Sequence, residues 1–301
     1  MLQRSGGLTR LLIRLALDER FPSLPTRMKG INVDYQDIIF EKIGPVARLW
    51  HNRPAVRNAE NTRLLDELNM ALADAEADPE IRVIVLAGKG GHFSAGHDLK
   101  EGRELRIGFA VEERWEYEER YYFGYCMNVL NCHKPTIAQV DGACIAGGFM
   151  LANMCDLMIA SEEAYFSDPV VHTMAVAAVE VLIHPWVLGA RKAKEMLFTG
   201  QRLTAADALA AGMVNRVVPA AQLEDAVMEM ASRVAQAPAF AMKVLKKSLN
   251  RTFDIMGREA ALRAHFDTHQ LTHFSNEANA FKASGATHAI RRDAFGRSAN
   301  V

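Results

Sequence analysis

The chain has 301 residues, half of them hydrophobic, and a formal net charge of -1. This length allows one large domain or two small ones with a substantial core. The near-neutral charge argues against a nucleic-acid-binding protein, which normally carries a basic surface. No apolar run reaches the roughly eighteen residues of a transmembrane helix, so we expect no membrane span.

Residues 1–27 form a basic, partly apolar extension. Arginines from Arg4 to Arg27 interrupt an apolar stretch around Leu11–Leu17. Such a segment is a transit peptide, a surface helix or an over-extended start. Asp18 and Glu19 count against a transit peptide, so we favour the non-targeting interpretations.

The rest of the chain alternates between strand and helix patterns, which predicts an α/β fold. The predicted elements are, in chain order, strands at 34–44 and 45–52 that meet at a Gly-Pro turn, a helix at 61–77, buried strands at 83–86 and 136–140, and helices from residue 222 onward.

Two loops that follow the buried strands are rich in small residues. They cover Phe93–Lys100 and Asp141–Gly148. Glycine and alanine allow tight turns and close approach of a ligand, so that free backbone N–H groups can face an oxygen that gains negative charge. Either loop alone reads as an ordinary strand-to-helix turn, but together they predict an oxyanion hole.

Other common site motifs are missing from the sequence. Ser94 has His92 and Gly96 at the positions where a nucleophile elbow needs two glycines. No strand is followed by GxGxxG and there is no P-loop, which removes the usual sequence evidence for a nucleotide site.

The four cysteines show neither CxxC nor zinc-type spacing, and three of them have apolar surroundings. They are typical of reduced core thiols. We therefore expect a cytoplasmic protein, with the mitochondrial matrix as the second choice.

Six motifs occur in the order found in one known family. They are Asn52–Asn58, Phe93–Glu101, Lys134–Pro135, Asp141–Asp156, Phe166–Pro169, and Met196–Gly200 leading to Ala211–Asn215. Through them the chain resembles the crotonase (enoyl-CoA hydratase/isomerase) superfamily. The resemblance implies a spiral core of ββα turns in residues 28–220 and a C-terminal helical region in residues 221–301 that assembles a homotrimer or hexamer.

The resemblance also implies a ligand, an acyl-CoA thioester. It places the backbone N–H groups of His97 and Gly147 on the thioester oxygen. It assigns contacts with CoA to four residues, Arg57, Ala95, Gly96 and Asp98. Coenzyme A is then part of the substrate, and neither a separate cofactor nor a metal is implied.

Hydratases of this family use two glutamates, and both are replaced here. The expected positions hold Met150 and Val170. Neither side chain can transfer a proton, so the standard hydration mechanism lacks its acid and base.

Other titratable residues are candidates for that role. Glu180 lies in an apolar run, where burial would raise its pKa toward neutrality. Asp168 either takes part in catalysis or caps a turn before Pro169. The segment 112–122, with glutamates at 116, 118 and 119, lines the acyl pocket or forms a solvated helix face. The His97 ring either joins the chemistry or packs away from it.

We therefore expect an enoyl-CoA hydratase/isomerase-like enzyme that stabilises a thioester enolate and acts on a non-standard acyl group, as a lyase, isomerase or acyl-CoA hydrolase. The alternative is a non-catalytic acyl-CoA-binding or assembly subunit. A carboxylate close to the acyl carbons would favour the enzyme.

Overall fold

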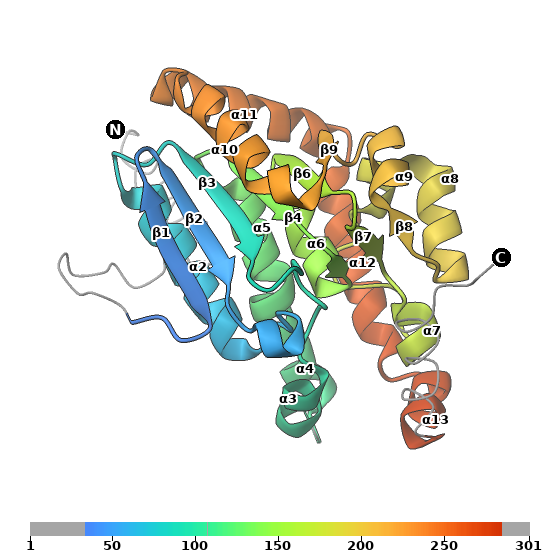
Figure 1. The fold of residues 1–301 in the computed structure, drawn as a ribbon. Helices are drawn as coiled ribbons and strands as arrows, with labels where there is room; N and C mark the ends of the chain where they lie inside the picture. The colour runs from blue at the N-terminus through green and yellow to red at the C-terminus, as the bar shows by residue number, and fades with distance from the viewer. Residues whose placement is uncertain (1–33, 107, 285–301) are drawn as a thin grey trace, which may run out of the picture. The chain divides into compact units, whose positions relative to one another are not determined.

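The chain folds around a six-stranded sheet in the order β1-β2-β3-β4-β6-β9 (Figure 1). The structure is a computed structural model that describes residues 34–106 and 108–284, so the predicted extension at residues 1–27 lies outside it. The strands of this sheet are β1 (Ile38–Ile43), β2 (Val46–His51), β3 (Val83–Gly88), β4 (Thr136–Val140), β6 (Leu157–Ser161) and β9 (Arg216–Val218).

The sheet starts with a hairpin and continues with parallel strands. β1 and β2 are antiparallel and turn at Gly44, whose φ of 55° suits glycine. Each later strand is parallel to its neighbour in the sheet. Parallel strands place their carboxyl ends at one edge, where α/β proteins commonly bind ligands.

Both faces of the parallel strands are buried. In β3, Val83 and Val85 face helix α10 (Leu223–Ala235), whereas Ile84 and Leu86 face the main core. This explains why the strand reads as a continuous apolar run.

A smaller three-stranded sheet stands beside the first. Its strands are β5 (Ala143–Ile145), β7 (Tyr165–Ser167) and β8 (Leu203–Thr204), in the order β5-β7-β8.

Helices surround the two sheets. Those of the first half are η1 (Pro54–Val56), α2 (Thr62–Ala77), α3 (Leu99–Leu105), α4 (Val111–Glu118), the π-helix η2 (Glu119–Gly124), α5 (Tyr125–Asn131) and α6 (Gly147–Ala152). Those of the second half are α7 (Val170–Met174), α8 (His184–Thr199), α9 (Ala205–Ala210), η3 (Ala220–Gln222), α10 (Leu223–Ala235), α11 (Ala239–Ile255), α12 (Arg258–Thr272) and α13 (Asn276–Ser284).

The predicted strands and helices are present, and the α/β class is confirmed. Asn61 caps α2 by accepting a hydrogen bond from the Leu64 N–H, which fixes the start of that helix. The boundary predicted after residue 220 falls at η3, from which α10 turns back onto the large sheet. All four cysteines are free thiols, and three of them are buried. Among the described helices, none has the length and apolar character needed to cross a membrane.

Candidate active site

The two loops predicted from the sequence meet at the carboxyl edge of the large sheet. β3 and β4 are parallel neighbours, so the segments that follow them leave the sheet side by side. The Ser94 N–H donates to the Ala143 carbonyl at 3.0 Å, and the Ile145 N–H donates to the Ser94 carbonyl at 3.0 Å. Ala146, with a φ of 48°, then turns the chain sharply into α6.

Glycine is required where the two loops touch. Gly96 has a φ of 86°, and a Cβ there would lie 2.8 Å from the Ile145 carbonyl oxygen and 3.1 Å from the Gly147 nitrogen. A Cβ on Gly147 would lie 2.4 Å from Glu60 Oε2 and 2.5 Å from His97 Cε1. The shortest contact at each position is closer than a Cβ atom tolerates. A larger residue at Gly96 or Gly147 would therefore push the neighbouring residues of the site apart.

Two backbone N–H groups stay free in this arrangement. Glu60 pairs with the strand-like segment beside it through Glu60 N–H to Gly96 O and Asp98 N–H to Glu60 O, both 2.9 Å. This pairing leaves the intervening His97 N–H pointing away from Glu60. Within the described residues, neither the His97 N–H nor the Gly147 N–H donates a hydrogen bond, as an oxyanion hole requires.

The His97 imidazole is fixed between two carboxylates. Nε2 lies 3.2 Å from Glu180 Oε2 as a hydrogen bond, and Nδ1 lies 3.2 Å from Glu60 Oε2 as an ion pair without hydrogen-bond alignment. The ring stacks on Tyr122 with centroids 3.6 Å apart. Burial favours the neutral ring, but Glu180 and Glu60 outweigh it and raise the pKa of His97 to about 9. His97 is therefore an imidazolium at neutral pH.

Glu60 was not among the residues predicted from the sequence. Its side chain is buried, and Oε1 lies 2.9 Å from Ser94 Oγ. A sequence signal for Glu60 was present, because Glu60 lies two residues after the Asn52–Asn58 motif. Nothing in the sequence shows that its carboxylate faces His97.

Glu180 is buried as expected, but the predicted direction of its pKa is wrong. Burial alone would raise the pKa. The charges of His97 and His269 outweigh burial and hold the pKa of Glu180 well below its ordinary value. Glu180 is thus ionised at neutral pH.

A second acid-base group lies beside the first. His269 on α12 is 3.5 Å from Glu180 Oε1 and 3.4 Å from Glu118 Oε2, and these carboxylates raise its pKa to about 10 against the effect of burial. Despite its own burial, Glu118 has a pKa of about 2 because His269 and Arg114 stabilise its charge. Burial lowers the pKa of the neighbouring His273 to about 3, so this ring is neutral.

Glu118, His269 and His273 are also spaced like metal ligands, with potential donor atoms within 4.8 Å of one another. Two neighbouring side chains, Arg114 and Gln270, oppose a cation here. The Arg114 guanidinium lies 3.1 Å from Glu118 and 3.4 Å from His273, and Gln270 Nε2 donates to Glu118 Oε2 at 2.7 Å. Arg114 therefore already supplies the positive charge that a metal would bring.

These groups line a cavity of about 70 Å³ next to the two free N–H groups. Its polar lining is His97, Arg106, Arg114, Glu118, Thr173, Glu180, His269 and His273, and its apolar lining includes Leu99, Ile145, Val170, Met174 and Val179. Val170 thus faces the cavity, whereas Met150 is buried in α6 and does not line it. The segment 112–122 contributes Arg114 and Glu118, and η2 places Tyr122 against His97.

The other predicted site residues have different positions. Asp168 does not line the cavity; it accepts hydrogen bonds from the Val170 and Val179 N–H groups. Asp98 caps α3 and pairs with Arg53 at 3.0 Å. Their assigned roles stay predictions.

Two residues assigned to CoA, Ala95 and Arg57, are hydrogen-bonded to each other beside the cavity. Ala95 lines the cavity, and its N–H donates to the Arg57 carbonyl at 2.9 Å. The Arg57 side chain is exposed beside this loop. It can therefore reach a ligand that extends out of the cavity.

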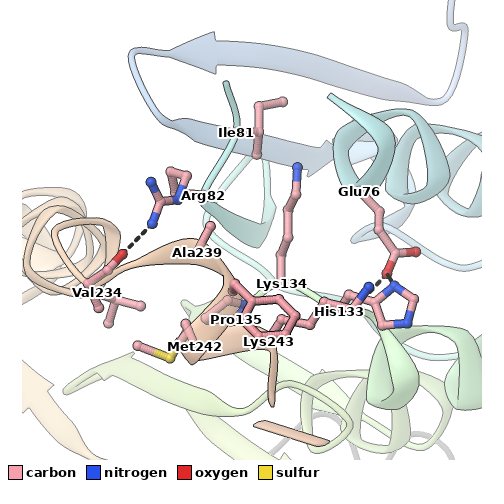
Figure 2. Close-up of a pocket in the computed structure, with 12 residues that line it drawn as sticks. Glu76, Ile81, Arg82, His133, Lys134, Pro135, Val234, Ala239, Met242 and Lys243 are labelled. Atoms are coloured by element: carbon pink, nitrogen blue, oxygen red, sulfur yellow. Dashed lines mark hydrogen bonds and ion pairs between the residues drawn. The ribbon is translucent and has the colours of Figure 1, made fainter. Parts of the chain in front are cut away.

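A larger cavity of about 340 Å³ lies at the opposite edge of the sheet, before β3 and β4 begin (Figure 2). Three of its polar side chains are already paired. Arg82 donates to the Ala237 carbonyl, Lys134 Nζ donates to the Ala75 carbonyl at 2.7 Å, and His133 pairs with Glu76 at 2.9 Å. Among the described residues, this larger cavity has no array of free donors like the array in the smaller cavity.

The raised pKa of His97 makes stability depend on pH. A histidine whose pKa is about 9 in the folded protein and roughly 6.5 in the unfolded chain stabilises the fold below pH 6.5 and loses that contribution as pH rises through 9. We expect the free energy of unfolding, measured in urea, to fall by on the order of 1–3 kcal/mol from His97 across this range. His97→Gln should make this pH dependence smaller, and the part that comes from His269, whose pKa is also raised, should remain. Exposed His133→Gln should leave the pH dependence unchanged. A flat wild-type profile would show that the buried imidazoles are neutral.

Comparisons with known proteins agree with this geometry. Residues 41–292 match the family model described as "Enoyl-CoA hydratase/isomerase". A Mycobacterium tuberculosis protein named among the enoyl-CoA hydratases, EchA13, is 40% identical over 260 residues, which are 80% of this chain and 81% of the relative.

Two crystal structures share the fold. One, from Mycobacterium smegmatis and named among the enoyl-CoA hydratases, has a TM-score of 0.75 and 44% identity, and the match covers 82% of this chain and 97% of that one. An enoyl-CoA hydratase/isomerase from Xanthobacter autotrophicus Py2 has a TM-score of 0.80 and 32% identity, with 87% and 100% covered. The chain therefore belongs to the enoyl-CoA hydratase/isomerase family, that is, to the crotonase superfamily.

Proposed function

We propose that this protein binds an acyl-CoA thioester, stabilises its enolate anion and moves a proton on the acyl group. The observation that carries the proposal is the pair of free N–H groups, at His97 and Gly147, beside a buried imidazolium. Each donor of such a hole contributes about 3 kcal/mol to the transition state. The His97 ring adds a fixed positive charge next to the developing anion.

Glu180 is the group that we assign to proton transfer. It is a cavity-lining carboxylate, and His97 holds its Oε2 at 3.2 Å. The thioester makes the α-hydrogen acidic once the oxyanion hole accepts the enolate charge, so a carboxylate can remove it. Asp168 is a weaker candidate because it does not line the cavity.

Coenzyme A would enter only as part of the substrate. Arg57 is exposed beside the loop 95–98 and would contact the nucleotide phosphates, while the small residues Ala95 and Gly96 would let the ligand approach the main chain. Asp98 would hold this loop through Arg53 rather than touch the ligand. The reduced thiols suit a cytoplasmic enzyme.

Exchange of the acyl α-hydrogen with solvent tests this function without knowledge of the product. In D₂O the protein should incorporate deuterium into bound butyryl-CoA, detected by mass spectrometry. Glu180→Gln keeps the side-chain volume and removes the base, so exchange should fall at least about tenfold with little change in affinity. Exposed Glu163→Gln, in the turn between β6 and β7, should leave exchange unchanged.

The alternative outcomes are distinct. Binding without exchange in the wild type would support the non-catalytic acyl-CoA-binding subunit. Normal exchange in Glu180→Gln with lower thermal stability would assign Glu180 to a structural ion pair.

Hydration of crotonyl-CoA should be absent or very slow. Met150 and Val170 occupy the places of both standard glutamates, and each lost acid-base group typically costs about 10²- to 10⁴-fold. A spectrophotometric assay of the enoyl thioester measures this rate. Turnover of roughly 10 per second, ordinary for an enzyme, would show that other groups of the cavity perform the standard chemistry.

The exposed face of α11 supports assembly with further copies of this chain. Its large apolar side chains are open to solvent, namely Phe240, Val244, Leu245, Leu249, Phe253 and Ile255, and its single buried residue is Lys246. Large apolar side chains that are exposed together on one helix are typical of a protein interface. We propose a homotrimer, or a hexamer built from two trimers.

Light scattering after size exclusion should give three or six copies of the 33.3 kDa chain. Leu245→Lys with Leu249→Lys should shift the protein toward monomer, because it places charges on the apolar face. Exposed Lys247→Gln on the same helix should not. A monomeric wild type at micromolar concentration would contradict the assembly.

A further inference from the structure

The acyl end of the cavity is more polar than a hydrocarbon chain requires. Arg106 comes from the end of α3, Arg114 and Glu118 come from α4, and His269 and His273 come from α12 and its C-terminal end. Burying such groups is costly unless each finds a partner. An acyl pocket for a plain alkyl chain would be lined by apolar side chains alone.

Two buried donors in this wall have no partner. Arg114 uses Nη2 for Glu118 Oε1 at 3.1 Å and for His273 Nε2 at 3.4 Å, but its Nε–H donates to nothing among the described residues. His273 is neutral and its Nε2 accepts from Arg114, so its proton lies on Nδ1, which also lacks a partner there. Arg114 and His273 both line the cavity. Buried donors without an acceptor destabilise a protein, so an oxygen acceptor on a bound ligand would stabilise this wall.

The balance of charge in the cavity also favours an oxygen acceptor. The guanidinium groups of Arg106 and Arg114 and the His269 imidazolium face two carboxylates, Glu118 and Glu180. His97 lies between Glu180 and a third carboxylate, Glu60, so that four positive groups share three carboxylates. One positive charge of the acyl end is therefore left over, and it favours an acceptor with negative charge.

We infer that the acyl group of the substrate is short and carries an oxygen acceptor at its far end, a hydroxyl or a carboxylate, which Arg114 and His273 bind. This inference rests on the proposed binding of an acyl-CoA. The cavity of about 70 Å³ has room for only a few non-hydrogen atoms, which sets the length. Val170, Met174 and Val179 cover the carbon chain, and the polar wall selects its end.

Calorimetric titration with three thioesters of equal chain length tests the inference. The ligands are butyryl-CoA, 4-hydroxybutyryl-CoA and succinyl-CoA, which end in a methyl, a hydroxyl and a carboxylate. The wild type should bind at least one of the two oxygenated thioesters about tenfold more tightly than butyryl-CoA. Preference for succinyl-CoA identifies a carboxylate, and preference for 4-hydroxybutyryl-CoA identifies a neutral oxygen.

Variants assign the preference to Arg114. Arg114→Met keeps much of the length of the side chain and removes its donors, so the affinities for the three thioesters should become equal within about threefold. Exposed Arg120→Met, further along the same helical segment, should keep the wild-type preference. If Arg114→Met does not fold, His273→Phe removes the second unpaired donor instead. The titration of the wild type with the three thioesters tests the inference about the acyl end without any variant.

The outcomes separate this inference from the proposed function. Failure of all three thioesters to bind would overturn the proposed function. Equal binding of all three by the wild type would overturn only the inference about the acyl end. A preference that persists in folded Arg114→Met and His273→Phe would overturn the assignment to these residues.

Discussion

The His97 imidazolium organises the site. It is held by Glu60 on one side and by Glu180 on the other, and it stacks on Tyr122. The backbone of the same residue supplies one of the two free N–H groups. The charged ring and this free N–H therefore belong to one residue, whose side chain three neighbours hold in place.

The balance between burial and charge explains why these groups stay ionised. Burial alone would favour neutral His97 and neutral Glu180, because transfer of an isolated charge from water is costly. The two groups lie 3.2 Å apart, and this contact between opposite charges outweighs burial in both pKa values. His97 also contacts Glu60, and Glu180 also contacts His269, so removing one partner would weaken but not abolish the stabilisation of the other charge.

The sequence was sufficient for the parts of the structure that depend on local patterns. The apolar run at β3, the leucine spacing of α2 and the two small-residue loops all led to the correct elements and brought Gly96 and Gly147 together. The resemblance to the family placed the two donors on one site. These features are short-range consequences of strand periodicity and of the room that glycine leaves.

What the sequence did not reveal depends on contacts between distant segments. His269 and His273 are four residues apart on one helix face, a pattern more often structural than functional, and only the fold brings them to Glu118. The same contacts reversed the expected pKa of Glu180, because its two imidazole partners come from positions 97 and 269. Glu60 was missed for the same reason.

A row of alternating carboxylates and imidazoles runs along the cavity, which the apolar Val170 also lines. The row runs from Glu60 through His97, Glu180 and His269 to Glu118. Such a row can redistribute a proton between neighbours without net charge change, because a His⁺–Glu⁻ pair and its neutral form differ only in the position of one proton. In the proposed function, such proton shifts would let the row respond to a negative charge at the thioester oxygen without movement of side chains.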